Sequence, residues 1–318
     1  MINRVRGRGT CIPLLYSLVL CFFCTRCLLF ESYAEEFKLP PSAGDNVIGR
    51  LYTVTVQNGE TLLDIARAHD IGYDQIIAAN PLQDRWLPTP GSLVLIPSLY
   101  VLPNTQRRGI VLNLAELRLY FYPPRGETVH TFPVSIGDVD WRTPIGITSI
   151  TAKQRDPTWT PPQSIIAEHE LEGEHLPRSI APGDPLNPLG RFALRLGIAR
   201  YLIHGTDESR SFGIGMRVSH GCIRLYPEDI EQLFNLVSVG TGVRIIHEPI
   251  KVGIRNGLVF LEVHKQDKDP YDRPWPFESP SLEDVYRIIA QFAASNISIN
   301  PDAIAAIYHQ GNGIPGEI

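Results

Sequence analysis

The stretch RVSHGCIRLYPEDI, residues 217–230, holds a cysteine among residues that could do chemistry. Cys222 follows Gly221 and lies two residues after His220 and two before Arg224. A thiol attacks a carbonyl as its thiolate, which needs a nearby base or positive charge to form at neutral pH. The glycine lets a substrate approach the backbone and lets amide N–H groups face a developing oxyanion. The segment therefore predicts nucleophilic acyl transfer, although a free cysteine is also often a small buried hydrophobe.

Two histidines could act as the base for this thiol. His220 is close in sequence, but its geometry around a turn is undefined. His204, in YLIHGTD, ends an apolar strand and is followed by Gly205, so we expect it at a strand terminus. Residue types and spacing alone leave the choice between the two histidines open.

The N-terminal segment bears on whether Cys222 is a functional residue. Residues 1–34 are typical of an export signal, because arginines precede an uncharged apolar run and SYA offers cleavage after Ala34. An uncleaved anchor is the alternative. After cleavage only Cys222 would remain, and a lone cysteine in an oxidising compartment has no intramolecular partner. Cleavage of the signal would remove the other four cysteines, which are Cys11, Cys21, Cys24 and Cys27.

Composition limits the kinds of protein that the chain can be. It has 318 residues, enough for two domains, and is 43% hydrophobic, enough for a sizeable core. Its net charge of -5 lacks the basic character of a nucleic-acid-binding protein. The 27 prolines and 26 glycines favour short strands and many turns over long helices.

The pattern of strands and turns divides the chain into segments. Residues 109–248 alternate in short runs and predict a predominantly β domain, with a helix starting at Pro227. The proline-rich stretch 155–190 is too long for a simple connection, so we expect a lid or a wall beside a site. The expected organisation is 1–34 signal peptide, 35–50 linker, 51–97 small β-α-α-β module, 98–108 linker, 109–248 catalytic domain and 249–318 C-terminal extension.

Residues 51–97 resemble a LysM module. The matching stretches are YTVTVQNGETLLDIA, IIAANP and PGSLVLIP, with Glu60 where the family usually has aspartate. LysM modules bind the N-acetylglucosamine backbone of peptidoglycan or chitin, so the resemblance implies an anchor on that glycan. A spacer of the same fold without sugar affinity is the alternative.

Residues 109–247 resemble the L,D-transpeptidase family with its YkuD-type catalytic domain. His204–Gly205, fourteen residues from Gly205 to Val218, and then SHGC at Ser219–Cys222 match the motif of that family, as do IRL and TPIG. The implied fold class is α+β, mainly β, with a β-rich catalytic domain behind the small βααβ module. The resemblance implies no cofactor and no metal. The run EHELEGEH, residues 168–175, matches no zinc spacing and predicts a solvated loop.

The resemblance also assigns roles to residues of the motif. It implies that His204 takes the thiol proton, with its ring oriented by the Gly205 carbonyl. It implies that Ser219, His220 and Gly221 shape the pocket, with backbone amides near Cys222 forming the oxyanion hole. Arg224 is placed to meet a carboxylate of the stem peptide, and an ordinary surface ion pair is the alternative.

The reaction implied is acyl transfer on the tetrapeptide stems of peptidoglycan through a thioester on the cysteine. The acceptor that the architecture favours is a lysine of an outer-membrane lipoprotein. Alternatives are 3→3 crosslinking, an L,D-carboxypeptidase or hydrolase, and a wall-binding protein with an idle catalytic domain. The expected partners are peptidoglycan and that lipoprotein, without nucleic acid, and the expected location is the periplasm or cell envelope.

Overall fold

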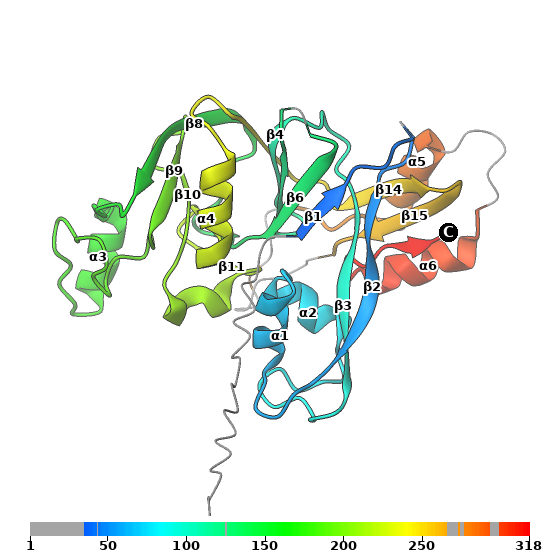
Figure 1. Cartoon of the computed structure of the whole chain (residues 1–318), viewed down its shortest axis with the longest axis horizontal. Coiled ribbons are helices and arrows are strands. Elements are labelled where there is room, and N and C mark those ends of the chain that lie inside the picture. The colour runs from blue at the N-terminus through cyan, green and yellow to red at the C-terminus, as the bar shows by residue number, and fades with distance from the viewer. Residues whose placement is uncertain (1–34, 43, 125, 266–272, 274–276, 293–298) are drawn as a thin grey trace, which may run out of the picture. The chain divides into compact units, whose positions relative to one another are not determined.

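The computed structural model describes residues 35–42, 44–124, 126–265, 273, 277–292 and 299–318 (Figure 1). The predicted signal peptide, 1–34, lies outside the described residues. Among the residues that are described, no helix is long and apolar enough to cross a membrane.

A nine-stranded mixed sheet forms the centre of the region predicted to be catalytic, in the order β1-β6-β5-β4-β13-β8-β9-β10-β12. A short parallel pair, β7 with β11, lies outside it. Together with the helices, these strands confirm the predicted α+β, mainly β, class. The strands are β1 (Glu35–Lys38), β4 (Gly109–Asn113), β5 (Arg118–Tyr122), β6 (Thr128–Pro133), β7 (Ile136–Gly137), β8 (Gly146–Arg155), β9 (Phe192–Leu196), β10 (Leu202–His204), β11 (Arg217–Ser219), β12 (Ile223–Arg224) and β13 (Gly242–Ile246).

Helix α4 (Pro227–Leu236) packs on this sheet directly after the cysteine segment. Proline occupies its first turn, where a missing N–H costs nothing, and acidic residues there suit the positive end of the helix. Ile230 and Leu233 are fully buried in the same apolar cluster as Ile203 of β10. The buried helix therefore fixes the chain after the cysteine against strand β10.

The βααβ module consists of β2 (Val47–Thr55), α1 (Leu62–Ala68), α2 (Tyr73–Ala79) and β3 (Leu93–Val101). Thr61 caps α1, and its hydroxyl and the Asp64 carboxylate form a capping box. Eight buried residues make its core: Val56, Leu62, Ile65, Ala66, Ile71, Ile76, Val94 and Ile96. The element order is the predicted one, but β2 and β3 pair from Val47↔Val101 onward and so extend beyond 51–97.

The segment 35–50, expected to be a linker, contains regular structure. Strand β1 pairs antiparallel with β6, from Glu35↔Thr131 to Lys38↔Thr128, and becomes the edge of the large sheet. Main-chain hydrogen bonds to an open strand edge require little from the side chains, so a polar sequence conceals such a strand. Phe37 adds an edge-on ring contact with Tyr100, at 6.1 Å between centroids.

The C-terminal part contains β14 (Ile250–Arg255), β15 (Leu258–Val263), α5 (Leu282–Phe292), α6 (Pro301–Gln310) and β16 (Gly316–Glu317), with the helices beside the hairpin (Figure 1). Asn256 and Gly257 both have positive φ, 53° and 81°, as a tight two-residue hairpin turn requires. Buried Lys251 pairs with Glu116 and Glu262, at 2.7 Å each, and so joins this hairpin to the β4–β5 turn.

Candidate active site

The two candidate reactive side chains come from neighbouring parallel strands. Strands β10 and β12 pair with Ile203 opposite Ile223 and His204 opposite Arg224. Cys222 immediately precedes β12, so it lies beside the start of β10. Because residues two apart in an extended strand point to the same face, Cys222 and Arg224 share the face that carries His204.

His204 is buried, with 2% of its surface exposed, and its ring is held by a backbone carbonyl. Its Nδ1 lies 2.6 Å from the carbonyl oxygen of Gly205. A carbonyl only accepts, so Nδ1 carries the proton and Nε2 of the neutral ring carries the lone pair. Burial, and secondarily the positive charge of Arg224, lowers the pKa of His204 to about 3. The imidazole is therefore neutral and able to accept a proton at neutral pH.

Cys222 is a half-buried free thiol. Its Sγ lies 3.6 Å from the carbonyl oxygen of Arg200. Burial raises the pKa of the thiol, while the backbone N–H of Leu202 and the charge of Arg224 act in the opposite direction. Among the described residues the thiol contacts the Arg200 carbonyl and not His204. Because burial disfavours the charged form of both groups, the resting state pairs a neutral thiol with a neutral imidazole.

The turn before Cys222 is held by two hydroxyl groups. The Ser219 hydroxyl accepts from the Gly221 N–H at 3.1 Å and donates to the Cys222 carbonyl at 2.5 Å. The Thr143 hydroxyl donates to the Gly221 carbonyl at 2.8 Å. Gly221 has φ of +96°, and a Cβ there would lie 2.9 Å from the ring of Tyr201. Only glycine fits this turn without strain.

The side chain of His220 contacts the proline-rich segment. Its Nε2 lies 2.8 Å from a carboxylate oxygen of Glu168, which belongs to helix α3 (Gln163–Leu171). Its ring centroid lies 5.4 Å from that of Trp141. The predicted lid or wall thus reaches the motif through His220.

Arg224 has a guanidinium without an ion-pair partner among the described residues. Its Nε is buried and makes no hydrogen bond. Asp207 is close enough to influence the pKa of Arg224, but its ion pair is with Arg210. Burial lowers the pKa of Arg224, yet a guanidinium stays charged at neutral pH. An uncompensated positive charge therefore lies beside Cys222.

Several residues around the turn have no role in the sequence prediction. Thr143 belongs to the TPIG stretch that matched the family, but the match assigned it no function. Gly137 of β7 approaches the turn so closely that a Cβ there would lie 2.8 Å from Gly221 Cα. Glu168 comes from the run expected to be a solvated loop, and no local pattern connects it with His220.

Among the described residues, two groups of side chains consist of residue types that commonly bind metal ions. His169, Glu172 and Glu174 lie together on the surface, where exposed acidic groups are common. Glu116, Glu262 and His264 lie together inside the protein, but the ammonium group of Lys251 already forms ion pairs with both carboxylates. Neither group contacts the cysteine motif.

Two family models and several known proteins match this chain. Residues 107–245 match the family model of the L,D-transpeptidase catalytic domain (YkuD), and residues 54–97 match that of the LysM domain. Escherichia coli K12 ErfK/SrfK, named a probable L,D-transpeptidase, is 43% identical over 76% of this chain and 79% of its own. YcfS of the same strain, also named a probable L,D-transpeptidase, is 42% identical over 76% of this chain and 78% of its own. The NMR structure of an E. faecium L,D-transpeptidase catalytic domain has 20% identity and a TM-score of 0.34, over 45% of this chain and 100% of that one.

Proposed function

The chain belongs to the L,D-transpeptidase family, and we propose that Cys222 is its nucleophile and His204 its general base. The observation that carries this assignment is the β10–β12 register, which brings the neutral, oriented imidazole to the face that holds the thiol. A base must be unprotonated to act, and burial keeps His204 in that form.

The acylation step begins when the thiol turns from the Arg200 carbonyl toward His204. Nε2 takes the thiol proton, and Sγ attacks the carbonyl carbon at the L-centre of the diamino acid in a tetrapeptide stem. The C–N bond to terminal D-alanine breaks, and the amine leaves with the proton that His204 held. A thioester on Cys222 remains.

In the second step an acceptor amine attacks the thioester. His204 takes a proton from the amine and returns it to the sulfur as the C–S bond breaks, which regenerates the thiol. The Gly221 N–H is already bonded to Ser219, so the N–H of Cys222 itself is the candidate donor to the oxyanion.

Arg224 orients the donor stem in this proposal. A guanidinium can hold a carboxylate through two parallel hydrogen bonds, which fixes its direction as well as its position. The absence of an ion-pair partner for Arg224 among the described residues favours this role over a surface ion pair. His220, engaged with Glu168, shapes the wall of the pocket.

The acceptor we propose is a lysine of an outer-membrane lipoprotein, in the periplasm or cell envelope. Support comes from the architecture, in which a predicted export signal and a LysM module precede the catalytic domain. Transfer to a second diamino acid would instead yield 3→3 crosslinks, and transfer to water would make a carboxypeptidase. Mass spectrometry of peptidoglycan from cells with and without the gene distinguishes these products.

We also assign glycan binding to the LysM module. Trp86 and Leu87 are exposed on the loop between α2 and β3, 53% and 82%, and an exposed aromatic ring suits the apolar face of a sugar. Retention of the Cys222→Ala protein on insoluble sacculi should decrease on Trp86→Ala. Unchanged retention would leave the module as a spacer.

Intact-protein mass spectrometry with a tetrapeptide donor tests the nucleophile. The wild type should gain the mass of the donor minus D-alanine, and Cys222→Ala should gain none while keeping its circular dichroism spectrum. An adduct on the folded Cys222→Ala protein would refute the assignment.

A further inference from the structure

One arginine of the LysM module bridges two separate segments of the catalytic region. Arg67, in the last turn of α1, makes a two-point ion pair with Glu228, its Nε and Nη2 lying 2.7 and 2.8 Å from the two carboxylate oxygens. Its Nη1 also pairs with Glu208 at 2.5 Å. These two acids raise the pKa of the guanidinium further, so Arg67 keeps its positive charge at every accessible pH.

The two acids belong to the segments that carry the reactive side chains. Glu208 begins the 3₁₀ helix η1 (Glu208–Gly213), four residues after His204. Glu228 lies in the first turn of α4, six residues after Cys222. Arg67 therefore connects the continuation of β10 with the continuation of the cysteine turn, from outside the catalytic domain.

A third contact reaches the segment that leads into the cysteine motif. Helix α2 begins at Gly72, which provides no side-chain cap. Its first amides, those of Tyr73 and Asp74, donate instead to the carbonyls of Ile214 and Gly215, at 2.8 and 3.3 Å. The catalytic segment thus satisfies helix-end donors of the LysM module that would otherwise lack partners.

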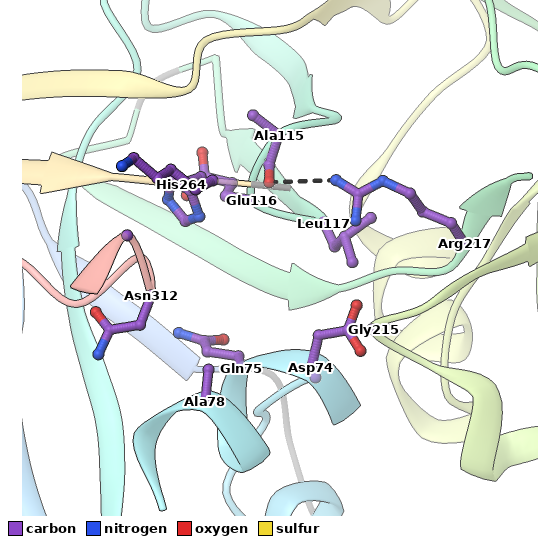
Figure 2. A pocket seen from close by; sticks show the side chains of 13 residues that line it. Asp74, Gln75, Ala78, Ala115, Glu116, Leu117, Gly215, Arg217, His264 and Asn312 are labelled. Atoms are coloured by element: carbon purple, nitrogen blue, oxygen red, sulfur yellow. Dashed lines mark hydrogen bonds between the residues drawn. The ribbon is translucent and has the colours of Figure 1, made fainter. Parts of the chain in front are cut away.

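This third contact is close enough to require glycine on both sides. A Cβ on Gly215, whose φ is +86°, would lie 2.3 Å from the Tyr73 nitrogen, and one on Gly72 would lie 2.8 Å from Gly215 Cα. Figure 2 shows Asp74 of α2 beside Gly215, where both line a pocket of about 110 Å³ that Arg217 also borders. From Arg217 the chain continues as β11 into the cysteine turn.

The geometry points to a second role for the LysM module, independent of glycan binding: it positions the catalytic turn, with Arg67 as the positioning residue. Three contacts hold the segment after His204, the segment before Ser219 and the helix after Cys222. A displacement of about 1 Å between reacting groups can lower a rate by a hundredfold, so small shifts in these segments matter. The inference rests on the proposed roles of the cysteine and histidine.

Acylation kinetics of the full-length protein test the role of Arg67. A soluble tetrapeptide without sugar serves as donor, so glycan binding by the module contributes nothing. Its concentration is varied to separate the maximal acylation rate constant from the apparent dissociation constant. For Arg67→Ala we expect the rate constant to fall about tenfold and the dissociation constant to stay within about twofold. Arg67→Lys keeps the charge but not the two-point geometry, so it should be intermediate.

Matched variants separate positioning from a loss of stability. Arg50→Ala removes an exposed arginine of the same module, whose guanidinium lies over the Tyr52 ring, and it should behave as wild type. Glu228→Gln should lower the rate constant like Arg67→Ala, and the double variant should be no slower than either single one. If Arg67→Ala fails to fold, Glu208→Gln, at a side chain 76% exposed, still tests the bridge and should slow acylation about threefold.

Full acylation rates in folded Arg67→Ala, or in both glutamine variants, would overturn the inference. So would a loss confined to the dissociation constant. Alkylation of Cys222 by iodoacetamide provides a readout that does not depend on the donor: Arg67→Ala should change its rate at least threefold. If the wild type forms no donor adduct but this alkylation rate still changes, the proposed reaction fails and the positioning role stands. If the wild type forms no donor adduct and the alkylation rate is also unchanged, the proposed reaction and the positioning role both fail.

Discussion

Two buried carboxyl groups meet where the LysM module contacts α4, and their replacement allows a quantitative test. Asp70 is 1% exposed and Asp229 is fully buried. Burial raises the pKa of Asp70 to about 7, although the charge of Arg118 and a hydrogen bond with Asp229 act in the opposite direction. Burial, and secondarily the charge of Asp70, raises the pKa of Asp229 well above its usual range. At neutral pH at least one of the two is therefore protonated.

The consequence for stability follows from the direction of these pKa values. Both are higher in the folded than in the unfolded chain, so their contribution is complete below about pH 4 and is lost as the pH rises through 7. At about 1.4 kcal/mol per pH unit, Asp70 alone removes about 4 kcal/mol from the free energy of unfolding over that range.

Asp229→Asn removes one ionisable group and keeps the shape. Its amide can donate to the ionised Asp70 carboxylate, and a hydrogen bond to a charged group contributes about 1.5–3 kcal/mol. We expect urea unfolding at pH 8 to show a gain of about 2 kcal/mol, and unfolding at pH 4 to show almost none.

Glu231→Gln, at an exposed position of the same helix, is the control and should change stability by less than about 0.5 kcal/mol at either pH. A folded Asp229→Asn protein with the pH dependence of the wild type, or one less stable at pH 8, would refute the shared-proton interpretation of this pair.

The remaining predictions concern the site. His204→Ala should slow acylation by on the order of a hundredfold, and more than His220→Ala does, because only His204 is proposed to move the proton. The opposite ranking of the two variants, in a time course of quenched samples read by mass spectrometry, would reassign the base to His220. Arg224→Lys should retain iodoacetamide reactivity but acylate poorly with the tetrapeptide, and Arg224→Ala worse; wild-type acylation in both would make Arg224 a surface residue. Because burial raises the thiol pKa, alkylation of Cys222 should still accelerate above pH 9. A plateau near pH 7 would contradict the neutral resting thiol.

The local patterns predicted most of the regular structure. Alternating apolar residues marked the strands of both folded regions, and Pro227 marked the start of α4. These signals are local because strand alternation, helix caps and tight turns each depend on residues close together in sequence. Strand β1 escaped prediction because its pairing with β6 uses backbone groups, which every sequence has.

The motif itself came from the sequence: SHGC, the preceding His-Gly, and the LysM pattern in front of them were sufficient to predict the family and the class of chemistry. Which groups surround that motif was decided by the tertiary structure. Glu168 reaches His220 from 52 residues away, and Arg67 reaches Glu228 from 161 residues away. Such pairs leave no periodicity or spacing in the chain, because their partners become neighbours only when the sheet and the two helices of the LysM module have packed. Burial, which keeps His204 neutral and the Cys222 thiol protonated, likewise exists only in the folded protein.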